Sequence, residues 1–345
     1  MEINKIVVLA AGTSTEREVS IKSGANICKA LRTAGYNAIV VDIFFGTDEQ
    51  DAFLQGADYD IEKQAAQMQQ NTKRVAEALA AGAPLISESA IALCKEADFV
   101  FLGLHGQNGE DGRIQAMFDL LGIRYSGTGH TGSAMAMDKG ITKQMLLGYD
   151  IPTPEGFVLH VSELEQTAAK PIPFLPCVVK PCCGGSSIGV YICDTEESYR
   201  EALQKAFQYE DEIVVEQYID GREFSIGVVD GKALPVIEII PDGWYDYENK
   251  YSGKTKEVCP AEIAPQLAEA MQRAAERAAE VLKLEAYCRI DFLVDAHDRY
   301  YCLEANTLPG MTAASLLPQE AAQIGLDYPA LCDYLVKVSM KKYEK

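Results

Sequence analysis

Oxygen-bearing side chains gather on two predicted strands in the C-terminal third of the chain. Asp291 lies in the first strand, and Glu304 and Asn306 lie at the end of the second. On neighbouring strands, two carboxylates and one amide offer the hard oxygen ligands that magnesium takes beside nucleotide phosphates. A solvated sheet edge would explain the same residues, but the flanking apolar residues indicate partial burial, which is costly for carboxylates without partners. This spacing predicts a metal–nucleotide site.

A second segment has the composition of a phosphate-binding loop. Lys180 and Pro181 end a predicted strand, and the run GGSSIG follows at 184–189. Glycine frees the backbone so that consecutive amides can close around phosphate oxygens, while the lysine adds a point charge. A plain β-turn has a similar composition, so this segment alone decides little. The sequence has no GxxxxGK[ST] motif and no GxGxxG after its first strand, which argues against a P-loop nucleotidase and a dehydrogenase.

Two polar loops near the N-terminus carry further candidates. GTSTEREVS at 12–20 contains Glu16, and HGQNGEDG at 105–112 contains His105 and Glu110. Glu16 at the first turn of a helix could serve only the helix dipole, or it could receive an ammonium group. The second loop could equally be a solvated turn. Both loops follow predicted strands, at the edge where ligands gather in parallel sheets.

The elements around these two loops alternate between strand and helix. Buried strands are predicted at Ile6–Ala10, Ala38–Ile43 and Asp98–Leu104, and an amphipathic helix runs to about Leu31. Such alternation is typical of a parallel sheet covered by helices. Residues 47–96, rich in Ala, Gln, Glu and Asp, are predicted as a helical elaboration with no assigned chemistry.

From about residue 130 the pattern changes to strands joined by hairpins and helices, which suits an α+β pair of subdomains. Helices are predicted near 196–209 and 262–283, and 241–261 is a long polar loop. The strands are expected to end at 178–180 and to occupy 190–193, 213–218, 224–229, 233–240, 286–294 and 300–304. The pair 224–229 and 233–240 is expected to form a hairpin around Asp230–Gly231.

Charge and composition exclude several classes of function. The 345 residues contain 31 Lys and Arg against 51 Asp and Glu, a formal net charge of −20, so a nucleic-acid partner is not expected. No apolar run is long enough to span a bilayer, and the N-terminal apolar run predicts a buried strand, not a secretory leader. The 10 cysteines include no CxxC pair and are expected to be the reduced thiols of a cytoplasmic protein.

Taken together, these segments resemble the D-alanine–D-alanine ligases of the ATP-grasp superfamily. Seven stretches carry the resemblance, in the family's order: GTSTEREVS at 12–20, LHGQNGEDG at 104–112, MDKGITK at 137–143, VKPCCGGSSIGV at 179–190, YDYENKY at 245–251, RID at 289–291 and EANTLPGMTAASLLP at 304–318. Each stretch is weak alone, but together they run from one end of the chain to the other.

The resemblance implies an ATP-grasp fold that combines α/β and α+β parts. It also implies an enzyme that ligates two D-alanines to supply peptidoglycan precursors. A Rossmann-like parallel-sheet domain would span 1–128, a central ATP-grasp subdomain 129–220 and a C-terminal one 221–345. The cofactors would be ATP and magnesium, with manganese as a substitute. D-Alanine and ATP would be the small-molecule partners, without nucleic acid or membrane, and the family suggests a cytoplasmic homodimer.

The resemblance also assigns nucleotide and metal contacts position by position. The residues expected to contact phosphates are Lys139, Lys180 and Lys250, the last of them meeting the transferred phosphoryl group. The residues expected to hold adenine and ribose are Glu216 and Glu223. The residues expected to bind two magnesium ions are Asp291, Glu304 and Asn306, with Glu304 bridging.

Substrate contacts follow in the same way from the family. Glu16 would receive the ammonium of the first D-alanine, in a loop-closing set with Ser186 and Tyr251. The loop residues assigned to the same substrate region are His105 and Glu110. The carboxylate of the second amino acid would be held by Ser315 and the amide of Leu316. Arg289 and the amide of Gly310 would donate to the tetrahedral oxyanion.

Two departures from the family pattern concern the nucleotide. The glycine loop carries Cys182, Cys183 and Gly184 where many relatives have a more polar, charged stretch. Gln217 follows Glu216 where many relatives place a lysine against adenine. Nucleotide affinity, loop closure or base recognition is therefore expected to differ from that of those relatives.

Other functions stay open on the sequence. D-Serine as second substrate is not excluded, because a pocket rejects one added hydroxyl poorly unless it is built to do so. D-Lactate is disfavoured, because Lys250-Tyr251 stands where lactate-preferring ligases of the vancomycin-resistance type tend to carry His. Another ATP-grasp carboxylate–amine ligase would share the metal and phosphate residues but not Glu16 and the 105–110 segment. A nucleotide-binding regulatory protein without catalysis would release no phosphate in response to D-alanine.

Overall fold

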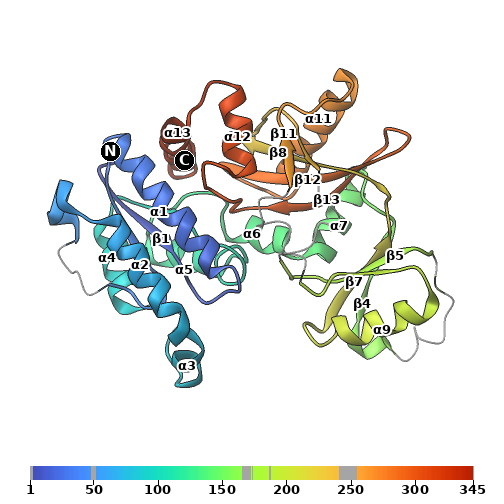
Figure 1. Ribbon diagram of the computed structural model, residues 1–345, viewed down its shortest axis with the longest axis horizontal. Coiled ribbons are helices and arrows are strands. Elements are labelled where there is room, and N and C mark those ends of the chain that lie inside the picture. Colours follow the sequence, from blue (N-terminus) through green and yellow to red (C-terminus); the bar gives the residue numbers. More distant parts are fainter. Residues whose placement is uncertain are drawn as a thin grey trace.

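Three β-sheets organise this computed structural model, which describes residues 3–47, 52–164, 172, 174–185, 188–240 and 255–344. In Figure 1 the N-terminal sheet lies on the left, and the other two sheets lie on the right, one above the other. The arrangement leaves the two right-hand sheets on either side of a common space, and a cavity occupies it.

The N-terminal sheet is parallel, as its alternating sequence predicts. Its order is β2-β1-β3, formed by β1 (Lys5–Ala10), β2 (Asn37–Asp42) and β3 (Phe99–Leu102). Apolar side chains fill these strands almost end to end because helices pack against them. The helical elements are α1 (Arg17–Thr33), η1 (Ala52–Asp58), α2 (Ile61–Asn71), η2 (Thr72–Arg74), α3 (Val75–Ala80), α4 (Glu88–Glu96) and α5 (Arg113–Leu121). The predicted elaboration is therefore largely helical where the structure describes it.

A buried ion pair fixes the loop between β1 and α1. Arg17, the first residue of α1, pairs with Asp42 at the end of β2, and both side chains are almost wholly buried. The same guanidinium donates to the carbonyl oxygen of Gly12 at 2.6 Å and to that of Met68 at 3.1 Å. A charge-assisted network of this kind holds its backbone acceptors firmly. The loop that carries Glu16 is thus anchored from both ends.

The central sheet is antiparallel and has the order β4-β7-β5-β6. Its strands are β4 (Gly156–His160), β5 (Cys177–Pro181), β6 (Tyr191–Cys193) and β7 (Glu212–Gln217), and its helical elements are α6 (His130–Met137), α7 (Lys139–Gly148), η3 (Val161–Glu163) and α9 (Glu196–Ala206). Tyr199 and Leu203 of α9 are buried against this sheet. The glycine-rich loop joins β5 to β6, so the sheet holds both ends of that loop.

The C-terminal sheet is also antiparallel, with the order β11-β10-β8-β12-β13 and β9 paired to β8. The strands are β8 (Gly221–Val229), β9 (Lys232–Ala233), β10 (Ile237–Ile240), β11 (Lys256–Val258), β12 (Tyr287–Asp295) and β13 (Tyr300–Asn306), and the helical elements are α11 (Pro265–Val281), α12 (Leu316–Gln323), α13 (Tyr328–Met340) and η4 (Lys341–Tyr343). Met271 and Ala275 of α11 are completely buried against the strands.

The strand predicted at 233–240 is interrupted, which corrects the sequence-based expectation. β9 ends at Ala233 and β10 begins at Ile237. Pro235 between them has no N–H to donate to a sheet ladder, and Leu234 instead donates to the carbonyl oxygen of Gly227 at 2.7 Å. A second difference lies in the predicted loop at 241–261, where β11 pairs with β10; residues 241–254 lie outside the described part of the chain.

The last helix returns to the N-terminal sheet. Figure 1 shows α13 beside α1, and the two helices are in contact. Leu331, Leu335 and Val336 of α13 belong to the same buried core as β1 and β3. The phenol of Tyr343 accepts a hydrogen bond from the amide of Tyr125 at 2.9 Å. The C-terminal end of the chain therefore completes the N-terminal core.

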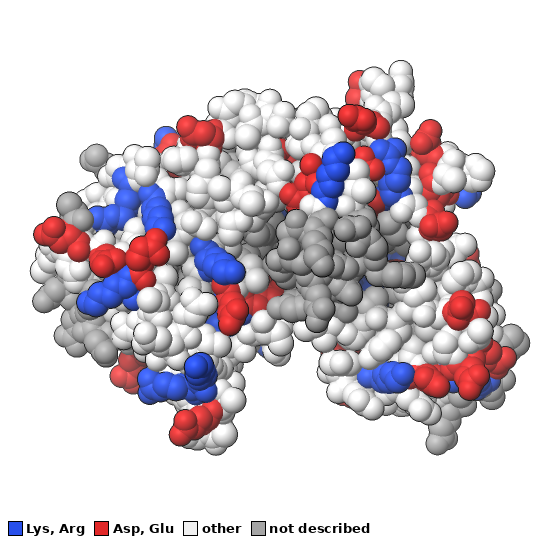
Figure 2. Space-filling view, in the orientation of Figure 1, with Lys and Arg blue, Asp and Glu red and all other residues white. Residues whose placement is uncertain are grey.

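The face of the molecule in Figure 2 carries acidic and basic side chains interspersed over the helices. Exposed ion pairs join Arg200 with Glu196 on α9 and Arg273 with Glu269 on α11. Exposed pairs contribute little to stability. Along the described residues, no helix combines the length and apolarity that crossing a bilayer requires.

Candidate active site

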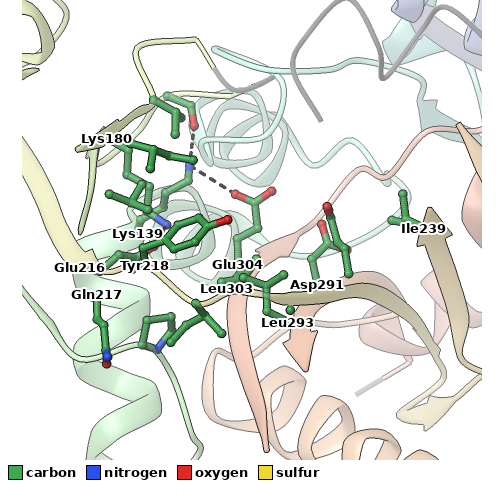
Figure 3. A pocket seen from close by; sticks show the side chains of 18 of the residues that line it. Lys139, Lys180, Glu216, Gln217, Tyr218, Ile239, Asp291, Leu293, Leu303 and Glu304 are labelled. Carbon is green, nitrogen blue, oxygen red and sulfur yellow. Dashed lines mark hydrogen bonds and ion pairs between the residues drawn. The ribbon is translucent and has the colours of Figure 1, made fainter. Parts of the chain in front are cut away.

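A cavity of about 650 Å³ lies between the central and C-terminal sheets. A volume of this size is typical of sites that bind small molecules and cofactors. Its lining comes from both sheets and from the glycine loop, and includes Lys139, Lys180, Gly184, Glu216, Gln217, Glu223, Asp291 and Glu304 (Figure 3). Most of the predicted nucleotide and metal residues that the structure describes are therefore gathered in one place.

Two of the predicted metal ligands face each other across a strand pair. Asp291 of β12 and Glu304 of β13 are direct partners in the antiparallel register, and Asn306 is the partner of Arg289. Alternate residues of a strand point to the same face, so all four side chains share one face of the sheet. Figure 3 shows Asp291 and Glu304 rising together, with Glu304 nearer to the lysines.

Asp291 is buried, and its oxygens are satisfied inside the protein. Arg289 donates to both of them, from Nε to Oδ1 at 2.9 Å and from its terminal nitrogen to Oδ2 at 2.7 Å. Ser225 of β8 donates to Oδ1 at 2.7 Å, and the amide of Asn306 donates to Oδ2 at 3.0 Å. The sequence argument held that this carboxylate would lack partners unless it bound a metal, whereas three neighbouring side chains already offset its burial.

The donor set still fits a divalent cation. Glu304 leaves 30% of its side chain exposed to the cavity, 3.6 Å from the ammonium of Lys139. In the described part of the chain no three His, Cys, Asp or Glu side chains come together as a metal site. A cation held by Asp291 and Glu304 would therefore complete its shell with the oxygen of Asn306, phosphate or water, as magnesium commonly does.

Two of the three lysines predicted to contact phosphates, Lys139 and Lys180, reach the cavity from different elements. Lys139 begins α7 and donates to the carbonyl oxygen of Gly184 in the glycine loop. Lys180 lies on β5 and donates to the carboxylate of Glu216 on β7. Both ammonium groups thus contact acceptors of the site itself, one on the loop and one on the neighbouring strand.

Lys143 is a buried residue of this site to which the sequence analysis gave no role. Its ammonium lies 3.0 Å from Oε2 of Glu216 and donates to Oγ1 of Thr153 at 3.1 Å and to the carbonyl oxygen of Pro154 at 2.6 Å. The sequence did contain one signal that Lys143 lies near the site. Lys143 follows Lys139 by four positions in the segment MDKGITK, and residues at that spacing share one face of a helix.

The Glu216 carboxylate is held in its ionised form by these lysines. Burial acts to raise the pKa of Glu216, but the charges of Lys180 and Lys143 outweigh burial and keep that pKa below its ordinary value. Burial lowers the pKa of Lys143, and the charge of Glu216 offsets part of this change. Two lysine side chains thus contact one carboxylate beside the cavity.

The two N-terminal loops meet each other near the C-terminal sheet. Ser14 donates to the carbonyl oxygen of His105 at 2.7 Å. Gly106 has a φ of +72°, and a Cβ there would lie 2.8 Å from Oε2 of Glu16, so glycine permits this approach. The amide of Gly106 donates to Oε2 of Glu110 at 2.8 Å. The three predicted substrate residues of these loops are therefore neighbours.

Glu16 also lies beside the glycine loop. A Cβ on Gly185 would be 3.6 Å from Oε2 of Glu16. Ser186, which follows Gly185, lies outside the described residues, as do Lys250 and Tyr251. The roles assigned to those three residues stay predictions.

Burial sets the protonation of the loop residues. Burial and the charge of Glu16 raise the pKa of Glu110 to about 8, although the Gly106 amide and the charge of Arg289 oppose the shift. Burial lowers the pKa of His105, while Glu16 acts to raise it. The His105 ring is fixed by Ser23 at 3.0 Å from Nε2 and by the carbonyl oxygen of Leu308 at 3.0 Å from Nδ1. Arg289 influences both pKa values, so these loops adjoin the C-terminal sheet.

The predicted carboxylate-binding residues lie at the start of α12. Ser315 precedes the helix, and Leu316 is its first residue. The hydroxyl of Ser315 accepts from the amide of Thr312 at 3.0 Å and lies 3.0 Å from a Cβ placed on Gly310. Backbone amides at a helix N-terminus attract anions. The position suits a substrate carboxylate, with Gly310 close by.

The residues that depart from the family pattern have ordinary structural environments. Cys182 is buried and Cys183 is exposed. Burial and nearby carboxylates raise the pKa of Cys182 to about 12 and that of Cys183 to about 11. Thiols of such high pKa are poor nucleophiles, which disfavours a redox role. Gln217 lines the cavity, and its backbone amide donates to the carbonyl oxygen of Glu155 at 2.7 Å.

Family models match both ends of the chain. The model described as D-ala D-ala ligase N-terminus covers residues 5–128, and that described as D-ala D-ala ligase C-terminus covers residues 148–337. A D-alanine–D-alanine ligase of Pediococcus pentosaceus is 42% identical over 354 residues, covering 99% of each chain. One of Lacticaseibacillus casei is 38% identical, covering 98% of this chain and 96% of the relative.

Solved structures show the same relationship. The D-alanine–D-alanine ligase of Bacillus anthracis, complexed with ATP, superposes with a TM-score of 0.73 at 29% identity and covers 99% of this chain and 100% of its own. That of Coxiella burnetii superposes with a TM-score of 0.76 at 26% identity, covering 100% of this chain and 96% of its own.

Two sheets around a cavity lined by lysines and acids, together with these structural matches, place the protein in the ATP-grasp class of fold. The family models and full-length relatives narrow the class further. The chain belongs to the D-alanine–D-alanine ligase family.

Proposed function

We propose that this protein joins two D-alanine molecules into D-alanyl-D-alanine at the expense of ATP, through a D-alanyl phosphate. Full-length relatives are D-alanine–D-alanine ligases, and ligation of two D-alanines by an ATP-dependent enzyme is the activity of the family to which the chain belongs. The observation that carries the proposal is the meeting of Asp291, Glu304 and Lys139 in one cavity between two sheets.

In the first step a carboxylate oxygen of D-alanine attacks the γ-phosphorus of ATP. The new O–P bond forms while the bond to the bridging oxygen breaks, so that D-alanyl phosphate and ADP result. Lys139 and Lys180 would neutralise phosphate charge from the loop and strand that carry them. Lys250 would meet the transferred group, and Glu223 would hold the ribose beside Glu216 at the base.

Magnesium fits the donor set of Asp291, Glu304 and Asn306, and bound there it would neutralise charge on the phosphates. Glu304, the more exposed of the two carboxylates, would hold a second ion as well as the first. The contacts of Asp291 with Arg289 and Ser225 fix the carboxylate before any cation arrives. Manganese would serve in place of magnesium, because the same oxygen ligands suit both.

In the second step the amine of the second D-alanine attacks the acyl carbon and expels phosphate. The tetrahedral intermediate carries an oxyanion, for which Arg289 and the amide of Gly310 would be donors. Ser315 and the amide of Leu316 would orient the second carboxylate at the start of α12. Ser186 and Tyr251 would close the site with Glu16 and exclude water, which would otherwise hydrolyse the acyl phosphate.

The first D-alanine would sit where the N-terminal loops meet. Glu16 would accept its ammonium, and the buried His105 and half-buried Glu110 would shape the wall behind it. Glu110 is largely protonated at neutral pH because its pKa is about 8. Glu110 would therefore add little negative charge beside the ammonium at neutral pH.

The test is a purified-protein assay with ATP, magnesium and each candidate amine. D-Alanyl-D-alanine is quantified by mass spectrometry, and phosphate release is followed in parallel. We expect product and phosphate in equal amounts with D-alanine, and neither with L-alanine. Phosphate release that does not depend on D-alanine would contradict the proposal.

D-Serine and D-lactate enter the same assay as second substrates. The relatives described above are D-alanine–D-alanine ligases, so the mixed dipeptide is not favoured. We expect D-alanine to give the highest kcat/KM. A higher value with D-serine would move the protein to the alternative specificity.

The wider biological setting follows from the product. D-Alanyl-D-alanine would serve peptidoglycan precursor synthesis, which contributes to the cell wall and cell shape and places the enzyme in the cytoplasm. Residues 1–128, 129–220 and 221–345 would act as its three domains, and two copies would form a homodimer. Sedimentation velocity measures the oligomeric state directly.

A further inference from the structure

A buried lysine behind the cavity wall contacts the carboxylate that faces the nucleotide. Lys143 is only 5% exposed and Glu216 only 4%. The cavity is lined by Glu216 and Lys180 but not by Lys143. Lys143 therefore acts on any ligand in the cavity through Glu216.

The contacts of Lys143 account for all three of its ammonium protons. Its three acceptors are Oε2 of Glu216 at 3.0 Å, Oγ1 of Thr153 at 3.1 Å and the carbonyl oxygen of Pro154 at 2.6 Å. A lysine can donate three hydrogen bonds and no more. This cage leaves Lys143 no donor for a nucleotide, and it defines where Oε2 of Glu216 must lie.

The other oxygen of Glu216 has a different partner. Lys180 donates to Oε1 from β5, and Lys180 lines the cavity on the side of the glycine loop. If Lys180 turns to nucleotide phosphates, as the proposed function requires, Oε1 loses a donor and becomes free to accept another. The remaining charge on this buried carboxylate must then be balanced by Lys143, because an unpaired buried charge is strongly unfavourable.

We infer that Lys143 is a positioning residue for the nucleotide: it holds Glu216 in place so that Lys180 can leave Oε1 and the exocyclic amino group of adenine can take the position. The inference rests on the proposed function, because it takes ATP as the ligand of this cavity. Adenine recognition and phosphate binding are then coupled, because Oε1 of Glu216 can accept from adenine only when Lys180 has turned to the phosphates. A hypoxanthine base, which presents an oxygen in place of the amino group, would be repelled by Oε1.

The test compares the binding of ADP and of inosine diphosphate, each with magnesium, by isothermal titration calorimetry. The wild-type protein should prefer ADP by about 10- to 100-fold, the range of a hydrogen bond to a charged group. Lys143→Met should weaken ADP binding by about 10- to 100-fold, because Lys180 is then needed by Glu216, and it should reduce the preference for ADP to near unity. The KM for D-alanine should stay within about threefold.

A double-variant cycle separates positioning from a general loss of structure. In a Glu216→Gln background, Lys143→Met should have no further effect on ADP binding if Lys143 acts only through Glu216. Lys342→Met is the matched control, since Lys342 donates to the carbonyl oxygen of Gly127 at 2.9 Å and contacts the Tyr125 ring, outside the cavity lining. That variant should lose stability without losing the preference for ADP.

Lys143→Met is expected to fold, because Glu216 keeps Lys180 as a counterion. Lys143→Arg serves as a second variant, since a larger planar guanidinium cannot reproduce the three contacts of the ammonium. It should show a smaller loss of the same preference. An undiminished preference for ADP in both variants, or in Lys143→Arg alone if the methionine variant does not fold, overturns the inference. A wild-type protein that binds neither nucleotide would instead overturn the proposed function.

Discussion

The ammonium of Lys139 lies 3.6 Å from Oε2 of Glu304, so the start of α7 meets β13 at the cavity. The same lysine donates to the glycine loop at Gly184. One side chain of α7 therefore contacts the glycine loop and lies beside the acid that we propose as a metal ligand.

Glu304→Gln should reduce ligation by at least about 100-fold at saturating magnesium. The substitution removes the charge of a proposed metal ligand, and losses of 10- to 100-fold already follow from changes to groups that only support ligands. The magnesium concentration for half-maximal rate should rise as well. Glu276→Gln is the control, because Glu276 has a similar exposure, 35%, and also lies near a lysine, Lys232. Unchanged magnesium dependence in Glu304→Gln would remove this residue from the metal site.

Arg289→Ala should lower turnover by about 10²–10³, the cost of losing an oxyanion donor. The variant also frees Asp291, whose two oxygens Arg289 contacts. Arg299→Ala provides the comparison, since Arg299 makes a similar contact with Asp295 on an exposed turn of the same strands. Steady-state kinetics should find the control near the wild-type rate. A near-normal rate for Arg289→Ala would refute its assigned role.

Glu110→Gln should retain most activity at pH 7. Burial and the charge of Glu16 raise the pKa of Glu110 to about 8, so the group is mostly neutral there and glutamine resembles it. The glutamine carbonyl can still accept from the amide of Gly106. Above pH 8 the wild-type protein gains a negative charge on Glu110 that the variant lacks, and its KM for D-alanine should fall relative to that of the variant, because this charge attracts the ammonium of the substrate. pH profiles of both proteins measure this, and an inactive variant at pH 7 would show that the ionised acid is required.

The same shift makes a prediction for stability. Because the folded-state pKa of Glu110 is raised from 4.5 to about 8, the folded protein binds the proton more tightly than the unfolded chain between these values. This contribution to the free energy of unfolding is complete below pH 4.5 and is lost as pH rises through about 8. Urea unfolding of wild-type protein and Glu110→Gln between pH 5 and 9 should show a flatter dependence in the variant. Parallel curves would contradict the shifted pKa.

Glu320 on α12 is completely buried, and its side chain contacts Gly227 of β8. Its Oε2 accepts from the amide of Gly227, while its Oε1 is buried without a hydrogen-bond partner. Burial raises its pKa well above the ordinary value, so its contribution to stability also falls as pH rises from about 4.5. Glu320→Gln should therefore increase the free energy of unfolding at pH 8, because glutamine cannot ionise and has no proton to bind or release between the folded and unfolded states.

The control for that substitution is Glu280→Gln, since Glu280 is exposed on α11 and pairs with Arg277. Urea unfolding at pH 5 and pH 8 should separate Glu320→Gln from wild type mainly at the higher pH. A variant that is less stable at both values would show that the Glu320 carboxylate contributes favourably as an ion.

Sequence patterns predicted the helices and strands best where a hydrophobic period extended over many residues or where an apolar run was buried on both faces. The strands at Ile6–Ala10 and Ala38–Ile43 correspond closely to β1 and β2, because parallel strands buried on both faces are apolar throughout. The hairpin that β8 forms with the strand after it was predicted less well. Pro235 interrupts that second strand, and Glu320 of α12 accepts the hydrogen bond of the Gly227 amide on β8. No local sequence pattern predicts this contact with a distant helix.

The contacts of the site likewise divide into those that the sequence predicted and those that it did not. The acids at 291 and 304 were expected on adjacent strands, and the register confirms this. The contacts of Asp291 with Ser225, and of Glu216 with Lys143, were not foreseen. Each of those pairs joins residues far apart along the chain, so their meeting depends on how strands and helices pack.

The amino-acid sequence by itself determined the family, the alternation of the first sheet and the oxygen-rich ends of β12 and β13, because motif order and periodicity are local properties of the chain. Only the tertiary structure decided that Arg289 holds Asp291, that Lys143 lies behind Glu216 and that α13 completes the N-terminal core. Such contacts are set by sheet register, by the side-chain conformations of packed neighbours and by the desolvation of buried charges. These quantities exist only when distant segments come together.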